Sequence, residues 1–340
     1  MRILVTGGTG YIGSHTVVAL LEAGHQVISV DNLSNSDISV NERIVEISGL
    51  SPSFFEVDLC DQAKLRNVFA QAGPIDGVIH FAAFKAVGES VAKPLLYYQN
   101  NVTGLLNLLA CMTDFGVGQL VFSSSCTVYG EPDALPVTEM APLRPAQSPY
   151  GATKQMGEQI IGDWVRATPN ARALLLRYFN PIGAHPSGKI GEWPRGVPNN
   201  LVPFITQTAA GLRDRLQIFG SDYPTPDGTC IRDYIHVCDL ADTHVLGLAK
   251  LPHLVSGGQV RALNVGTGSG TSVLEAVSAF ERANGVPVPR IFAPRREGDV
   301  VQIWADATTA MNVLEWSPRF SLDEAMRTAW LWEQNLRKHI

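Results

Sequence analysis

Short apolar runs alternate with helical stretches through the first half of the chain, and this alternation constrains the fold more than any other feature. Each apolar run is continuous, which is typical of strands that are buried on both faces of a sheet. The stretches between them, such as 12–24 and 101–116, end near a glycine suited to a helix C-cap. The expected strands are RILVT, HQVISV, PSFFEV, DGVIHFA, QLVFSS and ALLLRYF. The pattern predicts βαβ units and a doubly wound, Rossmann-type parallel sheet, an α/β fold.

The texture of the sequence changes after residue 180, where PIGAHPSGKIGEWPRGVPNN is rich in proline and glycine. We therefore expect a Rossmann domain over 1–180 and a smaller α+β substrate domain over 181–340, with the segment 236–268 returning to the first domain. The second part contains the short strands LQIFG, ALNVG and RIFAP. Helices are expected near 271–284 and 322–337.

The charge balance restricts the class of partner. The chain has 26 basic and 32 acidic residues, a net charge of −6, and no basic run, which argues against nucleic acid. The sequence begins directly with an apolar strand and has no apolar run of 18 residues, so neither a signal peptide nor a membrane span is expected. An anionic small molecule would have to be held by a few placed cations.

The cysteines and histidines predict neither disulfides nor a metal site. The cysteines are odd in number and show no paired spacing, which favours reduced thiols and a cytoplasmic protein; they are Cys60, Cys111, Cys126, Cys230 and Cys238. The eight histidines lack the spacing of metal ligands. His80 and His236 lie in apolar runs, and we expect them in the core.

A glycine loop follows the first expected strand. VTGGTGYIG places Gly7, Gly10 and Gly13 in a G-x-x-G-x-x-G pattern that opens a helix, with Tyr11 and Ile12 inside the pattern. Glycine lets the backbone approach a pyrophosphate, whose charge then lies at the helix N-terminus. This context, a strand before and a helix after, predicts a dinucleotide site.

The end of the next strand indicates which dinucleotide binds. Asp31 lies 24 residues after Gly7 and is followed by Asn32. A carboxylate there accepts hydrogen bonds from both ribose hydroxyls and repels a 2′-phosphate, so we predict NAD rather than NADP. Asp58 follows the third strand, within reach of the adenine amino group.

A tyrosine and a lysine share one helix face in SPYGATK. Ser148 and Pro149 are suited to the N-cap and first turn of a helix, and Tyr150 and Lys154 are four residues apart. A cation beside a phenol favours the phenolate, so we expect Lys154 to lower the pKa of Tyr150 and make it a base. The serines 123–125 end a strand, where ligands of parallel sheets bind, and one of them can hydrogen-bond a substrate hydroxyl beside Tyr150.

With these motifs in hand, the chain resembles the extended short-chain dehydrogenase/reductase family, and within it the nucleotide-sugar 4-epimerases. The likeness runs through nearly the whole length, in phrases that include VTGGTGYIGSH, DNLSNS, SSSCTVYGE, SPYGATK, RYFNPIGAHPSG, RDYIHV, LNVGTG and PRREGD. It implies reversible C4 epimerisation of UDP-galactose and UDP-glucose through a 4-keto intermediate, with NAD tightly bound, in a homodimer. It also implies that Ser125, Tyr150 and Lys154 act on the sugar.

The resemblance implies a cofactor shell and a substrate shell. The cofactor shell consists of Gly7, Gly10, Tyr11, Ile12, Gly13, Asp31, Asn32, Asn35, Ser36, Asp58, Leu59, Phe81, Ala82, Ala83, Lys85, Asn100, Ser123, Tyr150, Lys154 and Tyr178. The substrate shell consists of Ser125, Tyr150, Phe179, Asn180, Asn200, Leu201, Phe219, Arg232, Tyr234, Arg296, Asp299 and Ile303. Arginine suits a pyrophosphate because its fork binds two oxygens. Ile303 stands where residue size controls room at sugar C2, and a branched aliphatic there leaves acceptance of N-acetyl sugars open.

Three alternatives remain beside the epimerase. A 4,6-dehydratase would need an Asp-Glu pair where this chain has Cys126 and Thr127, and Cys126 is expected to be a buried small hydrophobe. A UDP-glucuronate decarboxylase is harder to exclude by motif, although the RDYIHV and PRREGD phrases favour the epimerase. A non-catalytic NAD sensor would not need Ser125, Tyr150 and Lys154 together.

Overall fold

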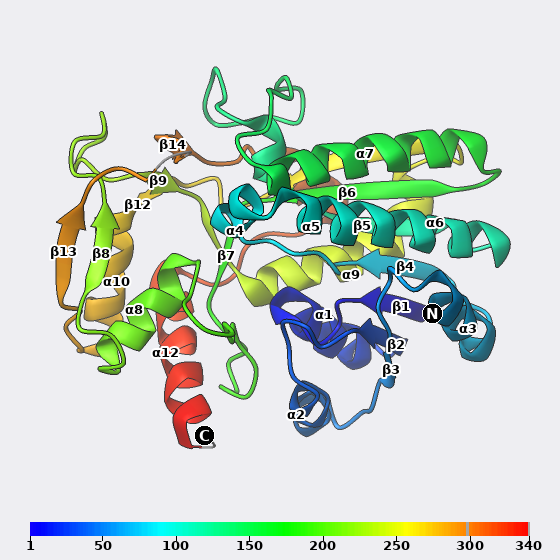
Figure 1. Cartoon of the computed structure of the whole chain (residues 1–340), viewed down its shortest axis with the longest axis horizontal. Coiled ribbons are helices and arrows are strands. Elements are labelled where there is room, and N and C mark those ends of the chain that lie inside the picture. Colours follow the sequence, from blue (N-terminus) through cyan, green and yellow to red (C-terminus); the bar gives the residue numbers. More distant parts are fainter. Residues whose placement is uncertain (297–298, 339–340) are drawn as a thin grey trace.

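The computed structural model describes residues 1–296 and 299–338. Its centre is a seven-stranded parallel sheet in the order β11-β6-β5-β4-β1-β2-β3 (Figure 1). The strands are β1 (Arg2–Thr6), β2 (Gln26–Asp31), β3 (Ser53–Glu56), β4 (Gly77–His80), β5 (Gln119–Ser125), β6 (Arg172–Tyr178) and β11 (Gln259–Val265). The predicted doubly wound parallel sheet is confirmed, because helices cover both of its faces.

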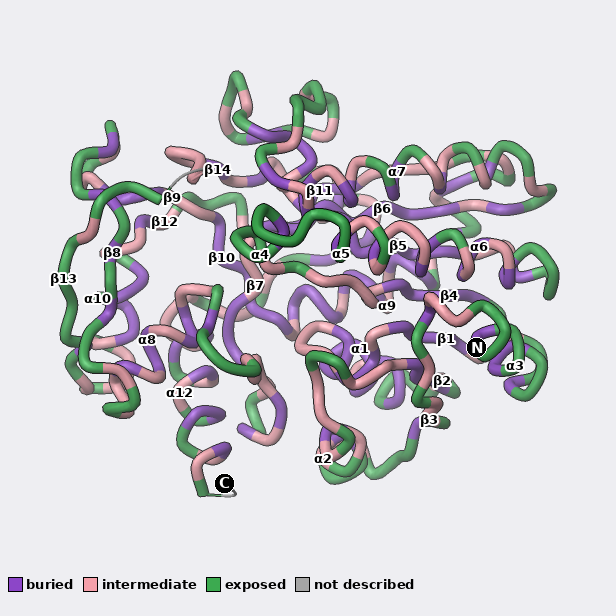
Figure 2. Tube along the Cα trace, in the orientation of Figure 1, coloured by how far each residue is buried: buried purple, intermediate pink, exposed green. Residues whose placement is uncertain are grey.

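Successive residues of the central strands enter two different cores. On one face, Ile3 and Val5 pack with helices α1 (Tyr11–Glu22), α2 (Ser39–Ser48) and α9 (Val237–Leu254). On the other face, Leu4 packs with α3 (Gln62–Ala72), α6 (Gly104–Asp114) and α7 (Pro149–Ala167). Figure 2 shows the strands of this sheet as the most continuously buried part of the chain. Burial on both faces explains why the strands read as continuous apolar runs.

The second half of the chain forms small sheets beside the large one. Strands β7 (Asn180–Ile182) and β10 (Tyr234–His236) pair in parallel, and β8 (Leu216–Phe219) pairs with β13 (Arg290–Ala293). Strand β9 (Ile231–Arg232) lies between β12 (Thr271–Ser272) and β14 (Gln302–Ile303). Helices α8 (Leu201–Ala209), α10 (Val273–Asn284) and α12 (Leu322–Lys338) form a third core with residues of β7, β8 and β10 (Figure 1). Helix α11 (Thr308–Leu314) packs instead on the first core.

Some local details differ from the sequence expectations or add to them. The helix expected at 271–284 begins at Val273, because Thr271 and Ser272 form β12 and Ser272 caps the helix in a capping box with Glu275. Strand β11 pairs with β6 and α9 packs on α1, so both contact the first half of the chain. The division of the chain at residue 180 stays a prediction. His80 and His236 are buried as expected.

Several short elements complete the chain: α4 (Val87–Ala92), α5 (Pro94–Tyr98), the π-helix η1 (Gln99–Thr103) and the 3₁₀-helix η2 (Cys126–Tyr129). Within residues 1–296 and 299–338, none of the helices has the length and apolar character needed to cross a bilayer.

Candidate active site

The predicted cofactor residues meet at the carboxyl edge of the large sheet. The glycine loop follows β1, Asp31 ends β2, Asp58 follows β3 and Phe81 follows β4. Ser123 and Ser125 lie at the end of β5, and Tyr178 pairs with Ser125 at the end of β6. Since parallel strands all end at one edge, residues far apart in sequence are brought to one place.

The glycine loop is shaped so that its backbone faces outward. Gly7 has a φ of +70°, and a Cβ there would lie 2.8 Å from the Ala82 backbone nitrogen. A Cβ at Gly13 would lie 2.0 Å from the Gly7 carbonyl oxygen. At Gly10, by contrast, the only atom of the described chain that a Cβ would meet within 4 Å is that same oxygen. The open side lies at the N-terminus of α1, where no side chain caps the helix, so the loop fits a pyrophosphate.

Asp31 is held with its carboxylate beside this loop. One oxygen accepts from the Thr9 backbone N–H (3.2 Å), and the other accepts from the Leu33 N–H (3.0 Å) and the Ser36 hydroxyl (3.2 Å). Asn32 donates to Asp58 (3.0 Å). A fixed carboxylate next to a phosphate loop fits ribose hydroxyls and disfavours a 2′-phosphate, so the donor set suits NAD.

Helix α7 carries Tyr150 and Lys154 on its buried face. Ser148 caps the helix by accepting from the Gly151 N–H (3.2 Å), with Pro149 in the first turn. The Lys154 ammonium lies 5.9 Å from the centre of the Tyr150 ring and donates to the Ser123 carbonyl oxygen (2.5 Å). The structure thus brings Ser125, Tyr150 and Lys154 together at the sheet edge, as the sequence predicted for their positions.

The prediction that Lys154 lowers the pKa of Tyr150 is wrong when the groups of the protein alone surround the phenol. Burial raises the pKa of Tyr150 well above its ordinary value, and the nearby Tyr178 adds to the rise, while a hydrogen bond with Ser125 counteracts it. Burial also lowers the pKa of Lys154 to about 8, against the pull of Glu158. Sequence spacing places the cation near the phenol but cannot report how completely both are removed from water.

Cys126 follows Ser125 and is not an activated nucleophile. Burial raises the pKa of its thiol to about 12, so the thiolate is scarce at neutral pH. Cys126 is partly rather than fully buried and packs against the cluster that contains Phe179 and Ile303, so the expectation of a buried side chain is met only in part.

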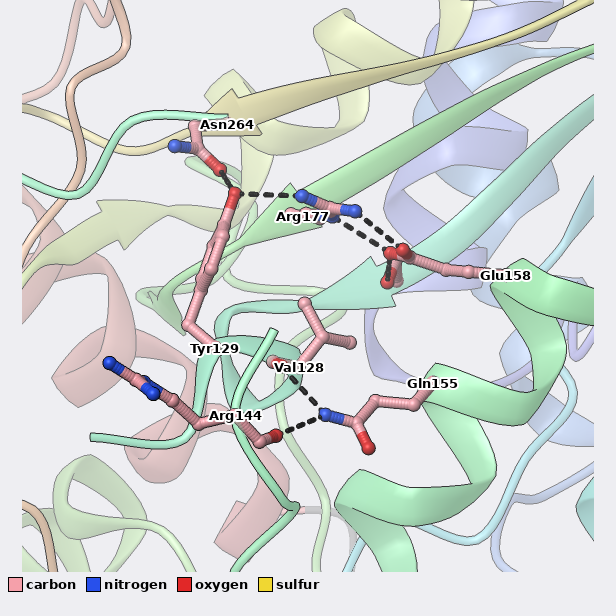
Figure 3. Close-up of polar contacts among 8 residues, drawn as sticks. Val128, Tyr129, Arg144, Gln155, Glu158, Arg177 and Asn264 are labelled. Carbon is pink, nitrogen blue, oxygen red and sulfur yellow. Dashed lines mark hydrogen bonds and ion pairs between the residues drawn. The ribbon is translucent and has the colours of Figure 1, made fainter. Parts of the chain in front are cut away.

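A buried polar network behind α7 was missed by sequence reasoning. Glu158 accepts from Arg177 through both oxygens (2.9 and 2.6 Å) and from the Ser124 hydroxyl (2.6 Å). Arg177 also donates to the Tyr129 hydroxyl (3.1 Å), which in turn donates to Asn264 (2.6 Å) (Figure 3). A signal was present, because Arg177 interrupts an apolar strand and Glu158 follows Lys154 by one helical turn.

The π-helix η1 connects the segment after β4 to α7. Asn101, which is buried there, donates to the Phe84 carbonyl oxygen (3.0 Å) and the Thr153 hydroxyl (3.1 Å). Its side-chain oxygen accepts from the Phe84 N–H (2.8 Å) and from Asn100 (2.9 Å). The predicted cofactor residue Asn100 is therefore supported by a neighbour that sequence reasoning did not select. Single π-turns inside helices are frequent at functional sites.

The predicted substrate residues gather around Asp299 in the second half. Arg296 donates to the Asp299 carboxylate (2.7 Å), and Arg232 lies 3.8 Å from the same oxygen. The Arg296 guanidinium also lies 5.9 Å from the Phe219 ring. Ile303 pairs with Arg232 across β14 and β9, and its side chain is buried with Phe179. Two cations thus lie together in an acidic protein; residues 297 and 298 of the PRREGD phrase lie outside the described residues.

The remaining predicted substrate residues lie on β7, β10 and the start of α8. Asn180 donates its N–H to the Asp233 carbonyl oxygen (2.9 Å), and Tyr234 is buried in β10. Asn200 precedes Leu201 at the start of α8. Glu192 accepts from Asn200 (2.6 Å) and from Lys85 (2.8 Å), which joins a predicted substrate residue to a predicted cofactor residue. Glu192 was not selected from the sequence, because it lies in the proline- and glycine-rich loop.

The described residues contain no cluster of three or more histidine, cysteine or acidic side chains arranged to hold a metal ion.

Comparison with known proteins gives consistent relatives. The family profile described as GDP-mannose 4,6 dehydratase matches residues 4–329. A UDP-glucose 4-epimerase of Erwinia amylovora is 52% identical over 333 residues, which cover 98% of each chain. The structure resembles the UDP-glucose 4-epimerase of Stenotrophomonas maltophila with bound NAD and formylated UDP-arabinopyranose (TM-score 0.96, 47% identity, 100% of each chain). It also resembles the UDP-glucose 4-epimerase of Bifidobacterium longum in complex with NAD+ and UDP (TM-score 0.95, 44% identity, 100% of each chain).

Proposed function

The chain belongs to the UDP-glucose 4-epimerase family, a branch of the extended short-chain dehydrogenase/reductases, and from this premise we propose how its own residues carry out the reaction. The reaction is the reversible interconversion of UDP-galactose and UDP-glucose at sugar C4, with bound NAD. The observation that carries the proposal is the buried group of Ser125, Tyr150 and Lys154 beside the dinucleotide loop.

The cofactor and the three side chains Ser125, Tyr150 and Lys154 have distinct roles. NAD, when bound, would supply the acceptor and donor of the hydride at sugar C4. Tyr150 takes the proton of the 4-hydroxyl and later gives it back. Ser125 orients the same oxygen, and Lys154 holds the nicotinamide ribose. Because the hydride returns, the sugar undergoes no net redox change.

The dehydratase alternative is not favoured, although the matched family profile carries that name. Elimination of water across C5 and C6 needs a general acid and a general base. Cys126 is a thiol with a pKa of about 12, and Thr127 has no ionisable group in the working range. The decarboxylase and sensor alternatives likewise leave unexplained why relatives at 52% identity over nearly the full chain are epimerases.

The substrate is held through its pyrophosphate and its sugar ring. Arg232 and Arg296 supply the guanidinium forks for the pyrophosphate, and Asp299 keeps them in place until the anion arrives. Ile303 forms the wall near sugar C2. Since isoleucine is smaller than an aromatic residue, we expect room for an acetamide at C2 as well as for a hydroxyl.

We further propose a cytoplasmic homodimer. All five cysteines are free thiols, as expected for a reducing compartment. Helices α5, α6 and α7 expose large apolar side chains, namely Leu95 (79% exposed), Leu106 (48%) and Met156 (44%). A second copy of the chain would cover this face, and sedimentation at equilibrium would show the dimer mass.

The function is tested with the purified chain and no added nicotinamide. UDP-galactose is supplied, and the nucleotide sugars are separated by chromatography. Appearance of UDP-glucose is expected, and UDP-N-acetylgalactosamine should be converted too if Ile303 leaves room for the acetamide. No conversion of UDP-galactose, even with NAD supplied, would contradict the function; conversion of UDP-galactose alone would contradict only the expected room at C2.

A further inference from the structure

Helix α7 repeats its polar residues at one-turn intervals along the buried face. Tyr150, Lys154 and Glu158 are each four residues apart and all are buried. Tyr150 and Lys154 belong to the proposed chemistry. Glu158 lies one turn farther from the sheet edge and has no place in it. A carboxylate in such a position must either be neutralised by a partner or serve a purpose that offsets its burial.

The partners of Glu158 come from two adjacent strands. Ser124 of β5 and Arg177 of β6 are directly opposite each other in the sheet register. Both donate to Glu158, the arginine through a two-pronged contact from Nε and Nη2. A two-pronged contact fixes the direction of the carboxylate as well as its distance. Helix α7 is therefore locked to β5 and β6 against sliding and rotation one turn from Lys154.

The same contacts continue toward the proposed sugar pocket. Arg177 reaches Tyr129 in η2, the short helix that follows Ser125, and Tyr129 reaches Asn264 in β11 (Figure 3). Asn264 donates to the Val137 carbonyl oxygen (2.8 Å), and Val137 packs in one cluster with Phe179 and Ile303. Gln155, the residue after Lys154 on α7, donates to the Val128 and Arg144 carbonyl oxygens (2.8 and 2.6 Å) (Figure 3).

We propose that Glu158, held by Arg177 and Ser124, is a positioning residue for the epimerase reaction: it sets Tyr150 and Lys154 in register with Ser125 and supplies the negative charge that keeps Lys154 cationic. The proposal rests on the proposed function, since it concerns the same catalytic group. It adds two residues, Glu158 and Arg177, that belong to neither the predicted substrate shell nor the predicted cofactor shell.

The charge part of the proposal depends on the surroundings of Lys154. Burial lowers the pKa of Lys154 to about 8, and Glu158 opposes this. The other titratable or charged groups around the Tyr150–Lys154 pair lie on β4, α5, η2 and β6; they are His80, Tyr97, Cys126, Tyr129, Arg177 and Tyr178. Burial raises the pKa values of these tyrosines and of Cys126 and lowers that of His80, which leaves them uncharged at neutral pH.

The test compares two variants with one control on the same helix. Glu158→Gln keeps the shape and removes the charge, whereas the double variant Glu158→Met/Arg177→Met removes the pair without leaving a buried charge behind. Asp163→Asn makes the same acid-to-amide change at an exposed position of α7, where the partner is Arg166. For each protein, kcat and KM for UDP-galactose are measured from neutral to alkaline pH, with thermal unfolding and the NAD retained after gel filtration.

The expected pattern separates positioning from mere structural support. Glu158→Gln should lower kcat about tenfold to hundredfold with little change in KM, because a small misplacement of reacting groups is costly. Its activity should also decline at lower pH than in the native protein, since Lys154 without the nearby anion loses its proton earlier. The double variant should regain thermal stability, while its kcat stays low and its activity declines at lower pH than in the native protein, because the Glu158 carboxylate is missing there too. Retained NAD should fall in both variants, and Asp163→Asn should match the native protein.

Two outcomes would overturn the proposal. One is a Glu158→Gln protein whose kcat, and the alkaline pH at which its activity declines, both equal those of the native protein. The other is a double variant whose kcat recovers together with its thermal stability, because the pair would then serve the fold alone. If Glu158→Gln fails to fold, the double variant decides. An inactive native protein would instead refute the proposed function, so the two failures are distinguishable.

Discussion

Arginine–carboxylate pairs occur in two regions of this protein whose surroundings differ sharply. Behind α7, Arg177 and Glu158 have side chains only 9% and 7% exposed. Between the turn that precedes α2 and the 186–196 loop, Arg195 pairs with Asp37 (2.7 Å), and these side chains are 40% and 32% exposed. The chemistry of the two pairs is alike, but water screens only the second. The first pair can therefore hold a catalytic helix rigidly. The second pair joins two halves of the chain, but breaking it costs little free energy.

The exposed region is held by several weak contacts rather than one strong one. Arg195 also donates to the Ser36 carbonyl oxygen (2.7 Å), and its guanidinium lies 4.6 Å from the Trp193 ring. The Arg43 guanidinium of α2 lies over both the Trp193 and the Trp332 rings, 5.3 and 5.1 Å from their centres. Such contacts contribute about 0.5–1 kcal/mol each at exposed sites. Ser36 is a predicted cofactor residue, so this region lies beside the ribose end of the dinucleotide site.

The largest effect is expected from one oxygen atom in the buried region. Tyr150→Phe removes the proposed base and keeps the ring, so kcat should fall about 10²- to 10⁴-fold. KM for UDP-galactose and the thermal midpoint should change little, because the ring still fills its site. Steady-state kinetics and thermal unfolding measure the three quantities. A Tyr150→Phe protein with native kcat would assign the proton transfer to another group.

The next effect contrasts a buried pair directly with an exposed one. Arg177→Met leaves the Glu158 carboxylate buried without its main partner and should cost about 3–5 kcal/mol of unfolding free energy. Arg166→Met breaks the ion pair with Asp163. The side chains of Arg166 and Asp163 are 64% and 60% exposed, so the loss of unfolding free energy should be less than about 1 kcal/mol. Urea unfolding at neutral pH gives both values. Similar losses in the two variants would mean that burial does not set the value of these pairs.

Sequence reasoning succeeded where one local pattern decides the structure. The strands of the large sheet were found because continuous apolar runs need burial on both faces, and Gly7, Gly13, Tyr150 and Lys154 because spacing alone gives their placement. Glu158 was missed because an acid on a helix is usually solvated. Only the fold reveals that Arg177, from an apolar strand, lies opposite it.

The direction in which the pKa of Tyr150 shifts could not be predicted from the sequence, for a related reason. The spacing of Tyr150 and Lys154 gives proximity, whereas desolvation depends on everything packed around them. Trp193 and Arg195 were missed because their loop has no periodicity. Their contacts with α2 and with the turn before it arise from tertiary packing between segments some 150 residues apart.

A third prediction concerns the buried histidines, which respond to pH rather than to salt. Burial lowers the pKa values of His15, His80 and His236 to about 3 and that of His244 to about 4, from 6.5. Below pH 6.5 these histidines bind protons in the unfolded chain but stay neutral in the folded chain. Stability should therefore be complete above that pH and fall by up to about 1.4 kcal/mol per pH unit for each histidine as the pH drops. Urea unfolding at a series of pH values, at low and high salt, should show a slope that salt barely changes.

The smallest effect is expected in the exposed region, and it should depend on salt. Arg195→Ala removes the pair with Asp37 and should cost at most about 1 kcal/mol at low ionic strength, less at high salt. The hydrogen bond from Arg195 lowers the pKa of Asp37 to about 2 from 3.8, so this contribution is present above pH 3.8 and is lost as the pH falls through 2. Unfolding free energies of native and variant protein at two salt concentrations measure it. A loss as large as that of Arg177→Met, and equally insensitive to salt, would show that the two regions are held in the same way after all.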